Sequence, residues 1–242
     1  MQSAPYIKTS NYEGRKGEVK KVVLLYSGGL DTSVMLKWIQ DEYKAKVIAL
    51  TIDIGQQADD LEAIKQKAVK LGAIKAIVVD AKDEFANEYI SRGIKANASY
   101  QGPYHLSTPL GRPLLAKIAV EVAQAEGADC IAHGCTGKGN DQVRIEGTIM
   151  TLNPELKIIA PVREWSMGRD EELEYAKKNN IEGFVVISFS YNSEGSLVIN
   201  DYNTSNTELS TYVISEMQKL QVCPWGKNPN NEYLVKINFT LL

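Results

Sequence analysis

Short apolar runs recur along the first two thirds of the chain and alternate with stretches of helical spacing. The apolar runs are KVVLLY (21–26), VIALTI (47–52), KAIVVD (75–80), DCIAH (129–133) and KIIAP (157–161). Each run has the length of a strand and is apolar throughout. Such strands are typical of a parallel sheet that helices cover on both faces. The pattern therefore predicts an α/β fold with a doubly wound parallel sheet.

The stretches between the runs have the spacing of amphipathic helices. In one of them Leu61, Ile64, Ala68 and Leu71 fall on one helical face, and Gly72 supplies a stop. Another helix is predicted to begin near Asp31.

Three segments lie outside this alternation. Residues 1–20 are polar and interrupted by glycine, which predicts a flexible extension. Beyond about Ile181 the rhythm stops, and NSEG, NDYNTSN and GKNPNNE predict a linker over 182–232 with one helix near Thr207–Leu220. Residues 233–242 predict an apolar strand that would stand alone unless something pairs with it. The regular α/β domain is thus expected over 21–181.

Composition narrows the function classes. A chain of 242 residues, 44% hydrophobic and 24% charged, can bury the core of one domain with an appendage. Its net charge of −3 gives no general field for nucleic acid. Neither a signal peptide nor a membrane span is indicated. The three cysteines lack a CxxC pair, so a disulfide framework or a four-cysteine zinc site is not expected. The predicted location is the cytoplasm.

Glycines and hydroxyls follow the first apolar run, in SGGLDTS (27–33). Glycines let backbone amides approach an oxyanion closely, and hydroxyls add donors at the start of a helix. The stretch therefore predicts a phosphate cradle, although its spacing matches neither GxGxxG nor GxxxxGK[ST]. The alternative is a tight strand-to-helix turn in which Asp31 caps the helix.

A second polar loop follows the fourth apolar run, in AHGCTGKGNDQVRIE (132–146). Thr136 and Asn140 can hydrogen-bond a polar ligand, Asp141 can hold an ammonium group, and Arg144 can clamp a carboxylate. A solvated loop is the alternative. Because the loop directly follows a buried strand, we favour a ligand site.

SGGLDTS resembles the pyrophosphate loop of the N-type ATP pyrophosphatases, which share an adenine nucleotide alpha hydrolase-like fold. These enzymes cleave ATP between its α and β phosphates and adenylate a substrate. The second loop closely resembles the HGATGKGNDQVRFE signature of the argininosuccinate synthase family. TIDIGQ, YQGPYHLSTPLGRPLLAK and LNPELKIIAPVREW lie in the family's order, so the resemblance covers roughly Lys21 to Ile181.

The resemblance implies a two-step ligase reaction of arginine biosynthesis. Citrulline attacks the α phosphate of ATP, pyrophosphate leaves, and the amino group of aspartate then displaces AMP. It also implies an ATP site in which Ser27 and Asp31 act in catalysis and Asp31 helps to position Mg²⁺. The implied ATP-binding residues are Leu25, Tyr26, Ser27, Gly28, Gly29, Leu30, Asp31, Thr32, Ser33, Ile52 and Gly134.

The other two substrates are assigned by the same resemblance. Aspartate is matched to Thr136, Asn140 and Asp141, and citrulline to Tyr104, Asn140 and Arg144. Catalysis would come from alignment and charge neutralisation rather than a covalent nucleophile. Cys135 is then expected to be a packing residue. Framework roles are expected for Arg112, Lys117, His133, Arg163 and Glu164.

The sequence also departs from the family's pattern. Pro109 and Asn192 stand where the family has serines that contact citrulline, and the tail resembles the strand that enters a second synthetase domain. A homo-oligomer or a partner chain would supply the rest. Two alternatives stay open: a relative that adenylates a different ureido, amide or carboxyl acceptor, and a non-catalytic nucleotide-binding homologue. A tRNA thiolase is disfavoured by the charge balance and the cysteine pattern.

Overall fold

The computed structural model describes residues 8–56, 60–102, 104–137, 139–165, 167, 169–179, 183–191, 197–204, 214, 217 and 233–239. The chain divides into two compact units. One consists of Met1–Gly28 and Thr32–Glu171, and the other of Gly29–Asp31 and Glu172–Leu242. Each unit has its own sheet.

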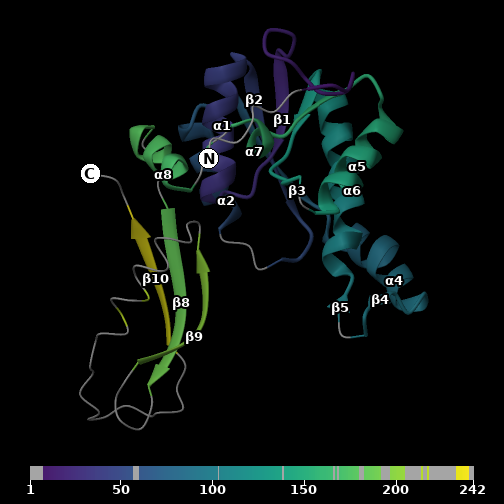
Figure 1. The fold of residues 1–242 in the computed structure, drawn as a ribbon. Helices are drawn as coiled ribbons and strands as arrows, with labels where there is room; N and C mark the ends of the chain where they lie inside the picture. The colour runs from purple at the N-terminus through teal and green to yellow at the C-terminus, as the bar shows by residue number, and fades with distance from the viewer. Residues whose placement is uncertain are drawn as a thin grey trace. The chain divides into compact units, whose positions relative to one another are not determined.

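The first unit is built on a five-stranded parallel sheet of order β3-β2-β1-β6-β7 (Figure 1). Its strands are β1 (Lys21–Leu25), β2 (Lys46–Asp53), β3 (Lys75–Asp80), β6 (Cys130–Ala132) and β7 (Lys157–Ile159). These five strands coincide with the five predicted apolar runs. The strands nearest the centre are almost wholly buried, which accounts for their being apolar throughout.

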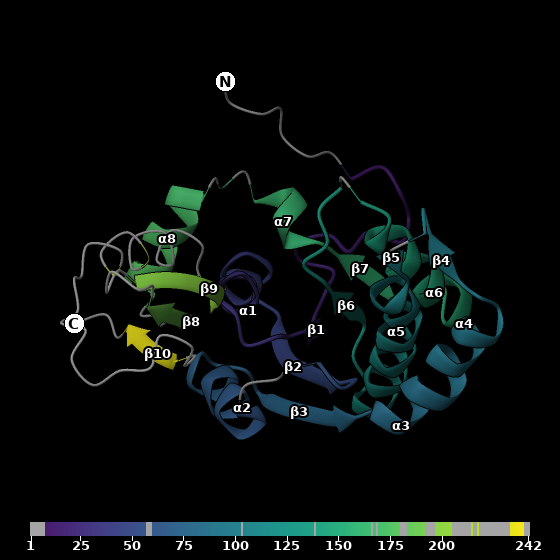
Figure 2. The same cartoon turned by 90° about the horizontal axis from the view of Figure 1, so that it is seen from below.

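Helices cover both faces of this sheet (Figures 1 and 2). The helices α1 (Leu30–Tyr43) and α2 (Leu61–Lys70) lie on one face, and α5 (Ser107–Glu126) and α6 (Asp141–Leu152) pack together on the other. The sequence predicted α2 and the start of α1 correctly. The doubly wound α/β fold is therefore confirmed. The core between these layers includes Val23, Ile48, Leu50, Leu114 and Ile131.

The long connection from β3 to α5 contains a helix whose middle turn is wound as a π-helix. Its parts are α3 (Lys82–Glu84), the π-helix η1 (Phe85–Ile90) and α4 (Ser91–Lys95), followed by a small hairpin of β4 (Ser99–Tyr100) and β5 (Tyr104–His105). Two further short helices follow β7, namely α7 (Pro161–Glu164) and α8 (Arg169–Lys178).

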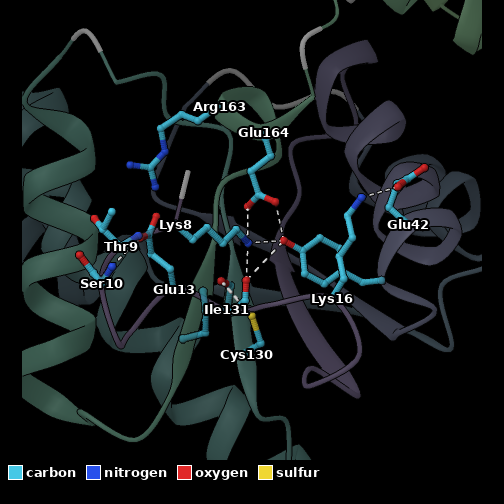
Figure 3. Close-up of polar contacts among 12 residues, drawn as sticks. Lys8, Thr9, Ser10, Glu13, Lys16, Glu42, Cys130, Ile131, Arg163 and Glu164 are labelled. Carbon is cyan, nitrogen blue, oxygen red and sulfur yellow. Dashed lines mark hydrogen bonds and ion pairs between the residues drawn. The ribbon is translucent and has the colours of Figure 1, made fainter. Parts of the chain in front are cut away.

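The N-terminal segment packs on the sheet, so the predicted flexible extension is wrong from Lys8 onward. Glu13 forms a parallel bridge with Ile158 of β7, and the amide of Gly14 donates to the carbonyl of Ile158 at 2.9 Å. Figure 3 shows Lys8 reaching Glu164, and this ion pair measures 2.9 Å. The segment thus covers the free edge of β7, whose backbone would otherwise be unpaired.

The second unit contains an antiparallel sheet of order β10-β8-β9. Its strands are β8 (Gly183–Tyr191), β9 (Leu197–Thr204) and β10 (Tyr233–Phe239). Two predictions are therefore corrected: residues 183–191 and 197–204 are strands rather than linker, and β10 is paired with β8 rather than alone. Ile187 is fully buried at the centre of this sheet. In the predicted helix near Thr207–Leu220 only Ile214 and Met217 are described, and both are helical.

Candidate functional site

The two polar loops singled out in the sequence follow adjacent strands. β1 lies between β2 and β6, and the chain winds from β1 toward β3 on one side and from β6 to β7 on the other. The strand order therefore reverses between β1 and β6. Doubly wound sheets bind ligands outside the carboxyl ends of the strands at such a reversal. Both SGGLDTS and GCTGKGND begin at that point.

Buried hydrogen bonds anchor the loop after β1. The amide of Tyr26 donates to the carbonyl of Leu50 at 2.8 Å, and the hydroxyl of Thr51 donates to the carbonyl of Tyr26 at 2.9 Å. The hydroxyls of Tyr26 and Ser33 lie 3.0 Å apart in the core. Burial raises the pKa of Tyr26 to about 12, so this hydroxyl stays protonated. The hydrogen bond between Tyr26 and Ser33 thus links the two ends of the loop on its buried side.

Gly28 has a backbone that only glycine adopts easily. Its φ is +81°, and a Cβ placed on it would lie 2.8 Å from Cγ1 of Ile64. The ammonium group of Lys67 donates to the Gly28 carbonyl at 2.9 Å. The loop is therefore held against α2 by both an apolar contact and a hydrogen bond.

The exposed part of this loop carries the groups that suit a phosphate. Ser27 is exposed, and its hydroxyl lies 3.2 Å from that of Thr32. Asp31 is exposed in the first turn of α1. The amide ends of α1 point toward the same place, as at many helix N-termini that bind anions. Leu30, by contrast, is buried.

The backbone of Ile52 is directed beyond the end of β1. Leu50 uses its carbonyl to bind Tyr26, and residues two apart in a strand turn their amides to the same side. Pairing of β1 with β2 ends at Leu25–Leu50, so the Ile52 backbone faces the space past the last paired residue of β1. Its side chain lies in the core. Its carbonyl accepts from the side-chain amide of Gln56 at 3.0 Å, so the amide of Ile52 is the group that would face a flat base.

The loop after β6 begins against α1. A Cβ on Gly134 would lie 2.7 Å from the methyl group of Met35, so a larger residue would have to displace that side chain. Thr136 and Asn140 are exposed. Asn140 precedes α6 without capping it by a side-chain hydrogen bond, so its amide group is not used at the helix end.

Asp141 lies between two arginines. The Nε atom of Arg112 donates to Asp141 Oδ2 at 2.9 Å, and Nη1 of Arg144 donates to Oδ1 at 3.3 Å. No sequence pattern indicated the Arg112 contact, because the two residues are far apart along the chain. An incoming ammonium group would share this carboxylate with the arginines. An incoming carboxylate would find two guanidinium groups beside it.

The expected framework residues are ion-paired. Lys117 binds Glu84 at 2.7 Å, Arg163 binds Glu146 at 2.6 Å, and His133 lies in the core with Nε2 3.1 Å from Glu146. These ion pairs are of the kind expected for framework residues, and the framework role itself stays a prediction. Cys135 is partly buried, and burial raises the pKa of its thiol, which favours the protonated form.

Two citrulline candidates are not placed by the structure. The side chain of Tyr104 and all of Asn192 lie outside the described residues. Pro109 is the third residue of α5. At that position a helix has an N–H without an intrahelical partner, and proline removes it.

The part of the chain that the structure describes has neither a metal cluster nor a membrane-spanning helix. It holds no group of three or more histidine, cysteine, aspartate or glutamate side chains arranged to bind a metal ion. Within the same residues, no helix is long and apolar enough to cross a membrane.

Comparison with known proteins identifies the first unit. Residues 21–182 match the family described as "Arginosuccinate synthase N-terminal HUP domain". An argininosuccinate synthase of Geobacillus thermodenitrificans is 60% identical over 161 residues, which are 66% of this chain and 39% of that protein. One from Brevibacillus brevis is 57% identical over 161 residues, 66% of this chain and 38% of that protein.

A longer alignment reaches into the second unit. The argininosuccinate synthase of Oceanobacillus iheyensis is 46% identical over 219 residues, 90% of this chain and 49% of that protein. The chain thus spans less than half the length of these relatives.

Two solved structures resemble the chain weakly. A U34-tRNA thiolase from Methanococcus maripaludis has a TM-score of 0.44 at 23% identity, covering 69% of this chain and 59% of its own. A 4-thiouridine synthetase bound to RNA and ATP has a TM-score of 0.47 at 17% identity, covering 68% of this chain and 42% of its own. The family assignment does not depend on these similarities. The match over 21–182, which contains both loops, shows that this chain belongs to the argininosuccinate synthase family.

Proposed function

We propose that this chain is the nucleotide-binding part of an argininosuccinate synthase-type ligase. In this reaction the ureido oxygen of citrulline attacks the α phosphate of ATP, and pyrophosphate leaves. The amino group of aspartate then displaces AMP and gives argininosuccinate. The observation that carries the proposal is the origin of both family loops at the carboxyl ends of β1 and β6, where the strand order reverses.

ATP would lie with its phosphates on the loop after β1. The glycine backbone, the hydroxyls of Ser27 and Thr32 and the N-terminus of α1 would bind the pyrophosphate end, and Ile52 would present its backbone to adenine. Gly134 would lie beside the nucleotide. The donors here would be fixed before the substrate arrives, which is how such sites favour charge build-up in a transition state.

Asp31 suits a magnesium ion that arrives with ATP. Magnesium in nucleotide sites commonly binds through one or two carboxylates together with substrate phosphates, so a single exposed carboxylate beside hydroxyls fits the ion. When bound, the ion would neutralise charge on the phosphates. Ser27 and Asp31 would orient the pyrophosphate as it leaves.

The co-substrates would bind along the loop after β6. Thr136, Asn140 and Asp141 are assigned to aspartate, with Asp141 receiving its ammonium group. Asn140 and Arg144 are assigned to citrulline, together with Tyr104. Residues beyond these 242, from a longer chain or from another subunit, would complete the site, since the aligned part covers less than half of the relatives' length. A cytoplasmic location fits a reaction on free amino acids and ATP.

Pro109 favours a second candidate function. A proline in the first turn of α5 removes an amide that could bind an acceptor, so the chain would adenylate a different ureido, amide or carboxyl compound. Aspartate would remain the second substrate in that case, because the loop after β6 is intact.

The test is pyrophosphate release by the 242-residue chain with Mg-ATP, citrulline and aspartate. The control is Ser27→Ala with Asp31→Ala, two exposed positions at which the fold should survive. Release that requires citrulline and is lost in the control supports the proposal. Release with another ureido, amide or carboxyl acceptor but not with citrulline supports the second candidate. Absence of ATP binding, also after addition of the corresponding C-terminal part of a relative, would refute both.

A further inference from the structure

A buried polar network lies directly beneath the loop of residues 134–140, here called the co-substrate loop. It joins His133 at the end of β6, Glu146 in α6 and Arg163 in α7. None of the three belongs to the residues assigned above to ATP, citrulline or aspartate. All three side chains are nearly inaccessible, with exposures of 1%, 4% and 13%. Burying charge so close to a ligand loop is costly unless the charge is compensated.

The hydrogen bonds determine the protonation of His133. The amide of Cys135 donates to Nδ1 at 3.2 Å, so Nδ1 accepts and carries no proton. The proton therefore lies on Nε2, which is 3.1 Å from Glu146 Oε1 and donates to it. His133 is neutral in this arrangement. It connects the backbone amide of Cys135, the second residue of the loop, to a carboxylate in α6.

Glu146 is ionised despite its burial. Burial alone would raise the pKa of Glu146, but the hydrogen bond from His133 and the charge of Arg163 outweigh it and keep the pKa below its usual value. Arg163 donates to the same oxygen at 2.6 Å. The network is therefore one cation against one anion with a neutral imidazole between, which is the compensation that a buried carboxylate needs.

Arg163 also lies beside the middle of the loop. A Cβ added to Gly137 would come within 3.7 Å of Arg163 Cδ, so a side chain at this position would meet the network. The network thus connects the start of the co-substrate loop, at Cys135, with α6, the helix that follows the loop and carries both Asp141 and Glu146. The exposed side chains of the loop therefore lie above a hydrogen-bonded network of buried side chains.

We propose that Arg163, acting through Glu146 and His133, is a positioning residue for the co-substrate loop. The inference rests on the proposed function, because it assigns the supported side chains to aspartate and citrulline. Loss of the network should loosen the loop and weaken aspartate binding. The ATP loop is anchored separately through Tyr26, Ile64 and Lys67, so ATP binding should be little affected.

The test compares two variants of the 242-residue chain with the wild type. Arg163→Met with Glu146→Gln removes both charges together, so that no buried charge is left unpaired. Lys8→Met is the matched control, because it breaks a buried ion pair to the neighbouring Glu164 in α7 without touching the loop. Hydrogen exchange of the Cys135 amide and binding of ATP are measured first. The Michaelis constants for aspartate and ATP follow.

We expect the Cys135 amide to exchange about tenfold faster or more in the double variant, and the Michaelis constant for aspartate to rise by a similar factor. In Lys8→Met the exchange rate of the Cys135 amide and the Michaelis constant for aspartate should each stay within about twofold of wild type. The melting temperature of this control should fall, because a buried ion pair is broken. Equal effects in the two variants, or none in the double variant, would overturn the inference. Should the double variant fail to fold, Arg163→Lys keeps the charge but loses the forked geometry, and the same measurements apply.

Failure of the proposed function would be distinguishable from failure of this inference. Exchange of the Cys135 amide and the position of the proton on His133, measured from its imidazole ¹⁵N shifts, require no substrate. A proton on Nδ1 in the wild type would overturn the network. An inactive chain with fast Cys135 exchange in the double variant would reject the ligase and keep the mechanical role of Arg163.

Discussion

Replacing Gly28 by alanine tests whether the loop after β1 is held as described. The φ of +81° costs an L-residue about 1–2 kcal/mol. The new Cβ would also lie 2.8 Å from Ile64 Cγ1, and turning that side chain away from its rotamer costs about 0.5–1.5 kcal/mol. Gly28→Ala should therefore lower the free energy of unfolding by about 1.5–3.5 kcal/mol.

Gly17 provides a matched control for this substitution. Its φ is +86°, but no atom lies within 4 Å of the position of its Cβ. Gly17→Ala should cost only the backbone term of about 1–2 kcal/mol. Shortening Ile64 to alanine in the Gly28→Ala background should recover the difference, after correction for Ile64→Ala alone.

Urea unfolding followed by fluorescence would measure the wild type and the four variants, and titration with ATP would show whether the shifted loop still binds. Equal losses for Gly28→Ala and Gly17→Ala would refute the contact between the loop and α2. A full loss of ATP affinity at unchanged stability would also contradict the reasoning, because the strain is expected to act on both.

Three other predictions follow from the described contacts. Tyr43→Phe removes a buried hydroxyl shared by Lys8 and Glu164 and should lower stability by about 1–3 kcal/mol in thermal unfolding; an unchanged melting temperature would contradict the network. The hydrogen bond from Lys82 lowers the pKa of Asp53, so this carboxylate adds stability above the ordinary aspartate pKa and loses it as pH falls through the lowered value. Lys82→Met should therefore flatten the decline of stability below about pH 4, and an unaltered acid profile would show that the pair contributes nothing. Arg112→Met removes one partner of Asp141 and should weaken aspartate binding about tenfold in calorimetry while ATP binding is retained; equal loss of both would point to misfolding.

The sequence predicted the parallel sheet well, because a strand that is buried on both faces appears in the sequence as an unbroken apolar run. Val22, Val23 and Leu24 are fully buried in β1, and an unbroken apolar run of this length bounded by polar residues is typical of such a strand. The same reasoning placed the two polar loops, since each directly follows a buried strand; their role as ligand sites stays a prediction. Their residue types favoured a phosphate cradle and a polar-ligand loop, and the family resemblance supplied the substrates.

Interactions made by main-chain atoms could not be predicted in this way, because they do not require particular side chains. The bridge from Glu13 to Ile158 uses main-chain atoms, so the polar composition of residues 1–20 predicts a flexible extension and gives no sign of this contact. Strands β8 and β9 were missed because asparagine and glycine around them suggested a linker. Long-range ion pairs such as Arg112 with Asp141 cannot be predicted from spacing, because nothing local fixes them.

The central claim is that one ligand, ATP, occupies the carboxyl edge of the sheet between β1 and β6. Hydrogen exchange with and without Mg-ATP tests it most directly on the intact 242-residue chain. We predict slower exchange in two separate segments, residues 26–33 and residues 133–137, with the Ser27→Ala, Asp31→Ala variant showing neither. Protection confined to one of these loops, or found only elsewhere in the chain, would contradict the site described.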